Sequence, residues 1–421
     1  MEILSKNDLR HNLVLNSTHE FCWGFGMAFH TTYAIVPLFL KQLGAPNSVV
    51  ISIAGLFAIL MAIPQVFSAL ISRNIQNIKR ATVGVHVLVW PPVFMMGFVF
   101  SFFSPSGSAA WIYYYLCSIL YGLTIGFLLP IWTEFLRNAV NEDSRGTFLG
   151  ISFAFNSFGG FFGGILVKLL FDSSISFPKN FGYGFFIYLI MIIIATLLYI
   201  GLRVKKPMEI REHRSIKQFF SETKKILFSQ INFRRYLIAR AFLTAIYPAV
   251  SLYAVFMQEK FGFDVSAAGI FTVLNVIAYG FSSYLSGKIG DRFGHKVAIV
   301  FSFSAHLLAV FTALFTTTMF GVYLVFFFLG VGLGSFMPAS MNMVYSFAGK
   351  NDSKIYMALV DTSSAPFILI AISAAAFISA QFGTVTLFWL IALTIFIGLV
   401  VMIFSVKDPG LVARNSDRIL V

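Results

Sequence analysis

Long uncharged stretches alternate with short charged ones along this chain. Residues 183–202 carry no charge, and residues 81–133 and 297–349 each extend for 53 residues without Asp, Glu, Lys or Arg. About 20 apolar residues are enough for a helix to cross a hydrocarbon core of roughly 30 Å. Strands of a membrane barrel would instead alternate apolar and polar residues over about ten positions. The pattern therefore predicts membrane-spanning helices.

Twelve apolar runs predict an all-α integral membrane protein with twelve transmembrane helices. The runs lie near residues 15–40, 48–71, 82–103, 109–133, 146–170, 182–203, 236–257, 267–286, 297–316, 319–345, 355–380 and 383–406. The polar N-terminus has no small-residue cleavage pattern before the first run, so we expect this run to be an uncleaved span.

Composition and charge agree with a membrane protein. The chain is 58% hydrophobic and 11% charged, with a mean hydropathy of +0.84, whereas soluble domains carry about a quarter charged residues. If the N-terminus lies inside, most Lys and Arg fall in loops on that same side, as in cytoplasmic loops. This bias accounts for the net charge of +13 without a nucleic-acid partner. We expect a bacterial plasma (inner) membrane protein with both termini in the cytoplasm.

Enzyme and metal motifs are absent from the sequence. It contains no phosphate-binding loop, no HExxH and no GxSxG, which are the motifs of ATP-driven pumps and hydrolases. Cys22 and Cys117 lie inside predicted helices and lack CxxC spacing, so neither a disulfide nor a metal site is predicted. We expect no catalytic residues, no metal ligands and no cofactor.

The two halves of the chain repeat one another. Gly126 and Pro130 in the fourth run parallel Gly334 and Pro338 in the tenth. The loops that follow are also similar, with NEDSR in the first half and KNDSK in the second. Internal repeats of helical bundles are the usual construction of secondary transporters.

The repeat predicts two pseudo-symmetric six-helix bundles. The first comprises residues 1–203, and the second, with a short cytoplasmic tail, comprises residues 236–421. Between them, residues 204–235 alternate apolar residues with Lys and Arg, which predicts an amphipathic cytoplasmic helix in the headgroup region.

The segment GKIGDRFGHK at residues 287–296 closely resembles the loop signature GxxxDRxGR[KR] of the major facilitator superfamily. The matching positions are Gly287, Asp291, Arg292, Gly294 and Lys296. The equivalent segment of the first half, ISRNIQNIKR at residues 71–80, keeps only the terminal basic pair. The resemblance implies the superfamily's twelve-helix fold and a loop that latches the cytoplasmic ends of the two halves. An ordinary positive-inside turn is the alternative.

The segment FNSFGGFFGG at residues 155–164 has the glycine spacing of the superfamily's antiporter signature GxxxGPxxGG. Phe155 and Gly160 replace its first glycine and its proline. Small residues also let helices approach closely in lipid, and we favour that interpretation.

Polar and aromatic residues inside the runs are candidates for solute recognition, because polar groups are costly in a membrane. By resemblance to the superfamily, helices 1, 4, 7 and 10 line a central cavity. The candidates are His30, Tyr33, Tyr114, Tyr121, Thr244, Tyr247, Ser251 and Asn275. An aromatic, mildly polar cavity suits a small organic solute better than a bare ion.

Three charged residues lie about five positions inside the cytoplasmic ends of their runs, namely Glu20, Arg240 and Asp361. Glu20 or Asp361 could couple transport to protons, since burial raises the pKa of a carboxyl group. Alternatively, one carboxylate pairs with Arg240 in a cytoplasmic gate, or Arg240 simply extends to the membrane surface.

These observations predict a monomeric secondary or facilitative transporter of a small organic solute, working by alternating access, with proton coupling left open. Its partners would be the solute, protons and the lipid bilayer. A multidrug or lipid efflux carrier is the alternative within transport. A transport-inactive receptor or assembly subunit with the same fold is the alternative from another class.

Overall fold

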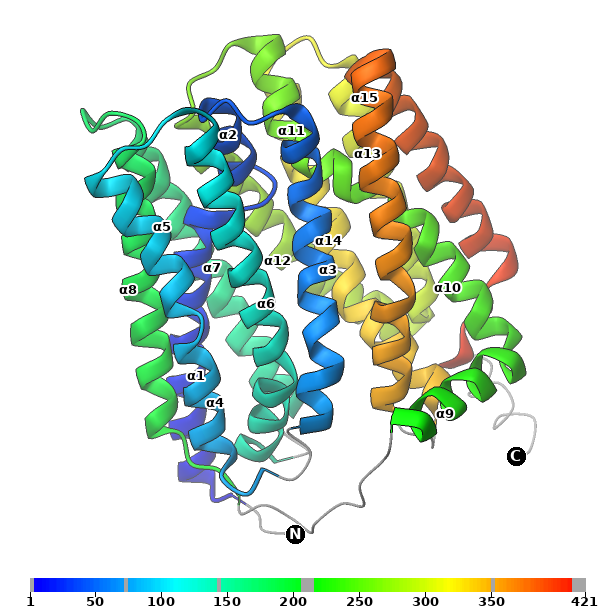
Figure 1. Cartoon of the computed structure of the whole chain (residues 1–421). Helices are drawn as coiled ribbons and strands as arrows, with labels where there is room; N and C mark the ends of the chain where they lie inside the picture. The colour runs from blue at the N-terminus through cyan, green and yellow to red at the C-terminus, as the bar shows by residue number, and fades with distance from the viewer. Residues whose placement is uncertain (1–3, 72–74, 142–144, 206–215, 350–352, 411–421) are drawn as a thin grey trace. The chain divides into compact units, whose positions relative to one another are not determined.

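The computed structural model describes residues 4–71, 75–141, 145–205, 216–349 and 353–410, and among them it contains helices and no strands. The helices, drawn in Figure 1, are α1 (Lys6–Met27), the 3-10 helix η1 (Ala28–His30), α2 (Ile35–Gln42), α3 (Asn47–Ile71), α4 (Ile78–Val87), α5 (Trp90–Phe102), α6 (Gly107–Ala139), α7 (Arg145–Phe171), α8 (Lys179–Gly201), α9 (Ile216–Ser229), α10 (Ile231–Leu243), α11 (Ile246–Phe261), α12 (Ala267–Phe293), α13 (His295–Phe315), α14 (Met319–Ala348) and α15 (Ser353–Ser405). The predicted all-α fold is confirmed.

The helices account for twelve spans, as predicted. Ten stretches of the described chain are long and apolar enough to cross a membrane. The first span, formed by α1, η1 and α2, is not among the ten. The last of the ten, Leu359–Ser405, contains two spans that meet at Gly383, where φ is 83°. Positive φ at this position favours glycine, which has no Cβ.

Three spans are interrupted, and the segment that resumes after each break has proline in its first turn. Pro37 lies in α2, Pro91 and Pro92 in α5, and Pro248 in α11. Proline lacks an N–H, and in the first turn of a helix no intrahelical hydrogen bond is lost by that. At the first break, the Thr31 hydroxyl accepts a hydrogen bond from the Ile35 N–H at 3.1 Å. Proline therefore suits the restart of these spans, although other prolines, such as Pro130 of α6, lie inside helices.

The chain divides into two compact units. Unit 1 contains residues 1–46, 57–213 and 263–273, and unit 2 contains residues 47–56, 214–262 and 274–421. Unit 1 thus draws mainly on the first half of the sequence and unit 2 mainly on the second. In unit 2, α9 covers part of the predicted amphipathic linker, and residues 206–215 of that linker lie outside the described chain.

Glycines bring α1 and α7 into backbone contact in unit 1. A Cβ on Gly159 would lie 2.0 Å from the Phe21 carbonyl oxygen, and a Cβ on Gly163 would lie 2.4 Å from that of Phe25. From the other side, a Cβ on Gly24 would lie 2.0 Å from the Asn156 carbonyl oxygen. The glycines of residues 155–164 therefore permit close packing, which agrees with the interpretation that we favoured.

Another close glycine contact occurs once within each unit. A Cβ on Gly126 of α6 would lie 2.4 Å from the carbonyl oxygen of Met61 in α3. In unit 2, a Cβ on Gly334 of α14 would lie 2.3 Å from the carbonyl oxygen of Tyr279 in α12. The sequence repeat at these glycines is thus a repeat of helix packing.

A methyl group at Gly163 should destabilise unit 1. Gly163→Ala places Cβ 2.4 Å from the Phe25 carbonyl oxygen and 2.7 Å from the Ala28 side chain, and such overpacking costs about 1–3 kcal/mol. In the same helix, a Cβ on Gly150 meets no atom within 4 Å. Gly150→Ala should therefore leave the melting temperature of the purified protein unchanged or raise it. Equal melting temperatures for the two variants would contradict this packing.

Candidate functional site

The break in the first span places a histidine against α6. His30 ends η1, and its Nε2 lies 3.0 Å from the Tyr114 hydroxyl oxygen. The ring of Tyr121 packs against His30 at a centroid distance of 5.0 Å. All three side chains are buried, whereas Tyr33 is partly exposed. Three of the predicted cavity residues therefore form one cluster in unit 1.

Two further residues, which the sequence analysis did not select, complete this aromatic cluster. The hydroxyls of Tyr188 on α8 and Tyr121 hydrogen-bond to each other. Both also approach the sulfur of Met27, at 3.1 and 3.3 Å. The cluster combines aromatic faces, hydroxyls and one imidazole, which are groups that bind organic molecules by stacking and hydrogen bonding.

The predicted cavity residues of unit 2 are more dispersed. Thr244 lies at the break between α10 and α11, where its hydroxyl donates to the Ala241 carbonyl oxygen at 2.6 Å. Tyr247 follows in the first turn of α11 and is partly exposed. Ser251 is buried and accepts a hydrogen bond from the Ala54 N–H at 3.1 Å. Thr244 and Tyr247 therefore lie at the break, and Ser251 joins two helices.

Asn275 also contacts a neighbouring helix. It is buried on α12, and its Nδ2 donates to the Phe326 carbonyl oxygen of α14 at 3.2 Å. A Cβ on Gly330 of α14 would lie 2.3 Å from the Asn275 carbonyl oxygen. This asparagine therefore stabilises the contact between α12 and α14.

Arg240 has several partners within unit 2. Its Nη1 donates to the Ser340 hydroxyl at 2.9 Å, and its Nη2 lies 3.9 Å from a carboxylate oxygen of Asp361. The guanidinium also stacks over the ring of Phe336, with Cζ 5.0 Å from the centroid. Asp361 is 49% exposed and Arg240 only 16% exposed. Asp361 is thus the carboxylate beside Arg240 in unit 2.

Glu20 has its described partners in unit 1. One carboxylate oxygen accepts from Asn156 Nδ2 at 3.0 Å, and the other lies 3.4 Å from His19 Nδ1.

Among the described residues, no three His, Cys, Asp or Glu side chains are grouped to hold a metal ion.

The superfamily-like segment 287–296 is more helical than its charge pattern predicts. α12 continues to Phe293, so the turn reduces to Gly294, which has a φ of 91°. A Cβ on Gly290 would lie 2.2 Å from the ring of His295, so this glycine lets the two helices meet closely. Gly287 has open space around it, and Arg292 lies over the ring of Phe293.

Lys296 binds the end of α15 through both its backbone and its side chain. Its N–H donates to a carboxylate oxygen of Asp408 at 2.8 Å, and its Nζ donates to the Ile403 carbonyl oxygen at 2.7 Å. The side chain of Asp291 lies outside the described part of the structure. The contacts that the structure gives for Lys296 therefore lie within unit 2.

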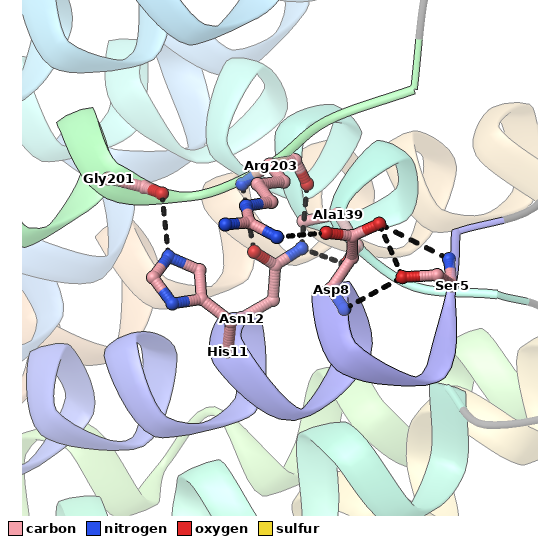
Figure 2. A network of polar contacts seen from close by, with 7 residues as sticks. All are labelled: Ser5, Asp8, His11, Asn12, Ala139, Gly201 and Arg203. Carbon is pink, nitrogen blue, oxygen red and sulfur yellow. Dashed lines mark hydrogen bonds and ion pairs between the residues drawn. The ribbon is translucent and has the colours of Figure 1, made fainter.

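An asparagine near the start of α1 holds the ends of two other helices in unit 1 (Figure 2). Asn12 Nδ2 donates to the carbonyl oxygens of Ala139 at 2.8 Å and Arg203 at 2.6 Å, and Asn12 Oδ1 accepts from the Arg203 N–H at 2.8 Å. A ring nitrogen of His11 lies 3.1 Å from the Gly201 carbonyl oxygen. The contacts at Ala139 and Gly201 satisfy carbonyl groups that the last turns of α6 and α8 leave unpaired. We call the Asn12 contacts with Arg203 an asparagine clasp.

An ion pair supports this clasp at the surface. The Asp8 carboxylate pairs with the Arg203 guanidinium and also contacts the Ser5 hydroxyl (Figure 2). Hydrogen bonding to Arg203, and then to Ser5, holds the pKa of Asp8 below its usual value.

Unit 2 repeats the asparagine clasp with different residues. Near the start of α10, Asn232 Nδ2 donates to the Lys407 carbonyl oxygen at 2.9 Å, and the Lys407 N–H donates back to Asn232 Oδ1 at 2.8 Å. A lysine contact also repeats, because Lys79 Nζ donates to the Ile200 carbonyl oxygen at 3.2 Å in unit 1, as Lys296 does at the end of α15. The two units therefore fix the end of their sixth span in the same way.

Comparison with known proteins assigns the chain to a family. A family profile described as Major Facilitator Superfamily matches residues 91–257 and 241–418. The chain belongs to the major facilitator superfamily. The comparison with curated protein sequences finds no match.

Solved structures of the superfamily share the fold. The nucleoside transporter NupG is 14% identical, with a TM-score of 0.70 over 94% of this chain and 99% of that one. A POT family transporter in complex with 5-aminolevulinic acid is 13% identical, with a TM-score of 0.69 over 94% and 96%. A D-xylose-proton symporter is also 13% identical, with a TM-score of 0.69 over 95% and 98%. The structural neighbours are thus transporters, and at this identity the likeness concerns the fold.

Loss of Asn12 should loosen only the helix ends of unit 1. Asn12→Ala removes the partner of two carbonyl groups and one N–H, and an unsatisfied buried polar group costs about 1–3 kcal/mol. We expect faster amide hydrogen exchange, measured by mass spectrometry, at the ends of α6 and α8. Asn232→Ala is the matched control, since it should speed exchange around Lys407 alone. Equal changes in both units, from either variant, would contradict two separate clasps.

Proposed function

We propose that the chain is a secondary transporter that moves a small organic solute across the membrane by alternating access. The observation that carries this proposal is the pair of breaks in the first and seventh spans, which begin the two halves of the repeat. Transporters use discontinuous helices to build binding sites near the middle of the membrane. His30 lies at the first break and Thr244 at the second.

The chemistry around the first break supports an organic solute. His30, Tyr114, Tyr121 and Tyr188 bring an imidazole and three hydroxyls among aromatic rings. Such groups recognise rings, hydroxyls and amines, whereas a bare ion needs several oxygen ligands. The similar solved structures are a nucleoside transporter, a transporter in complex with 5-aminolevulinic acid and a D-xylose-proton symporter, and all three molecules are small organic compounds.

The proposal includes proton coupling through a carboxylate. Glu20 is buried in unit 1 with one amide donor, and Asp361 lies beside Arg240 in unit 2. A carboxylate that alternates between paired and unpaired surroundings can bind and release a proton during transport. We further propose that the chain works as a monomer in a bacterial inner membrane, with cytoplasmic termini and no enzymatic activity.

A solute should stabilise the purified protein through Tyr114. A thermal-shift screen of metabolites and drugs would give a ligand, and uptake into liposomes would test its transport. Tyr114→Phe removes the hydrogen bond to His30 and should weaken binding of that ligand about tenfold, a loss of about 1.4 kcal/mol. Tyr183→Phe, at an exposed tyrosine, is the control and should bind as the unmodified protein does.

Other outcomes of this experiment distinguish the alternatives. Ligands drawn only from drugs or lipids would favour an efflux carrier. Liposomes that move no candidate solute, with or without a pH gradient, would favour a transport-inactive receptor or assembly subunit. Unchanged binding in Tyr114→Phe would contradict the site at the first break.

Neutral substitutions at the two carboxylates should separate coupling from binding. Glu20→Gln and Asp361→Asn keep the size of each side chain and remove its charge. We expect at least one of them to abolish solute accumulation driven by a pH gradient while exchange of labelled for unlabelled solute continues. Uptake still driven by a pH gradient in both variants would rule out these carboxylates as the coupling groups.

A further inference from the structure

A buried ionisable pair lies on α1 apart from the aromatic cluster. His19 and Glu20 have side chains only 3% and 5% exposed, with His19 Nδ1 3.4 Å from a Glu20 oxygen. The other Glu20 oxygen accepts from Asn156 Nδ2 at 3.0 Å. Within the described chain, neither ring nitrogen of His19 has a hydrogen-bond partner. A buried carboxylate with one neutral donor is poorly stabilised unless a proton or a cation neutralises it.

Two aromatic rings stack on His19. Its ring stacks on Tyr199 at a centroid distance of 3.8 Å and an interplanar angle of 13°, and on Trp23 at 6.0 Å and 14°. The Tyr199 ring is held in place, because its hydroxyl accepts from Trp132 Nε1 at 2.6 Å and donates to Asn16 Oδ1 at 3.3 Å. Aromatic faces attract a cation within about 6 Å, most strongly where water is excluded. These stacked rings therefore favour a charged His19 over a neutral one.

The other titratable groups near Glu20 are less suited than His19 to carry the proton. On α4, His86 approaches the His19 ring edge-on, with centroids 5.7 Å apart. Its Nδ1 lies 2.7 Å from the Thr82 carbonyl oxygen, and because a carbonyl only accepts, that nitrogen carries the proton of a neutral ring. Tyr199 faces His19 from α8, Asn156 of α7 does not titrate, and Cys22 lies one turn further along α1.

We propose that His19 and Glu20 together form a proton-binding site, in which His19 holds the proton as an imidazolium stacked against Tyr199 and Trp23, and Glu20 is its counter-ion. Uptake forms one N–H bond on the ring with a proton from water, and release returns that proton to water. With the proton the pair is neutral overall, and without it the pair carries one buried negative charge, which the apolar surroundings disfavour. This site refines the coupling part of the proposed function, on which it rests, by naming the group that carries the proton.

Tryptophan fluorescence reports on this site without any solute, because an imidazolium quenches an adjacent indole. The full chain in detergent is titrated between about pH 5 and pH 10, with and without Trp23→Phe, and the difference is the emission of Trp23. We expect this emission to rise as the pH increases. The midpoint should fall by more than about one pH unit in Glu20→Gln, since the counter-ion is then lost.

His306→Gln provides the matched control. His306 is a buried histidine of unit 2, and its replacement should leave the Trp23 titration unchanged. Emission from Trp23 that does not vary with pH, or the same midpoint in Glu20→Gln, would overturn the proposal.

A second measurement covers variants that fail to fold. In nitrogen-15 NMR of the unmodified, histidine-labelled chain at about pH 7.5, where ordinary histidines are neutral, we expect one imidazolium signal. Its absence, or its survival in a folded His19→Gln variant, would also overturn the proposal. If the titration occurs but no solute is transported, the proton site stands and the proposed function fails.

Discussion

Backbone groups at helix ends and breaks must find partners when the surroundings are apolar, and much of this structure follows from that constraint. At the first break, the Thr31 hydroxyl accepts the Ile35 N–H. At the end of α6 and after α8, Asn12 provides the missing donors. The same constraint makes charged side chains costly inside a span. Glu20 and Arg240 accordingly lie among polar and aromatic partners.

The two units meet this constraint with equivalent residues at equivalent places. Asn12 and Asn232 each exchange two hydrogen bonds with the residue that follows the sixth span of their unit. Gly126 and Gly334 each allow close backbone approach in the fourth. Each unit is therefore braced by its own contacts. The polar residues near the breaks in the first and seventh spans are free to differ, as the aromatic cluster around His30 and the dispersed residues of unit 2 do.

The candidate site could be predicted only in part. Tyr114 and Tyr121 share a face of the fourth span by helical spacing, and the structure joins them to His30 of the first span. Tyr188 was missed, although a tyrosine hydroxyl in an otherwise apolar run was a usable signal. Asn232 gave no such signal, because an asparagine beside a basic linker is also typical of an exposed loop. The partners of such residues are distant in the chain, so periodicity along one helix cannot identify them.

The sequence by itself determined that the chain lies in a lipid bilayer, and it determined the number of spans, the two-half repeat and the family. Hydrophobic run length and internal repetition can be read directly along the chain. The tertiary structure decided where spans break and which polar groups meet. Residues 287–293, whose charges predicted a loop, continue α12, and the turn is left to Gly294. Likewise, only folding brings Tyr199 of the sixth span against His19 of the first. Contacts between helices far apart in the chain depend on packing, which local patterns do not encode.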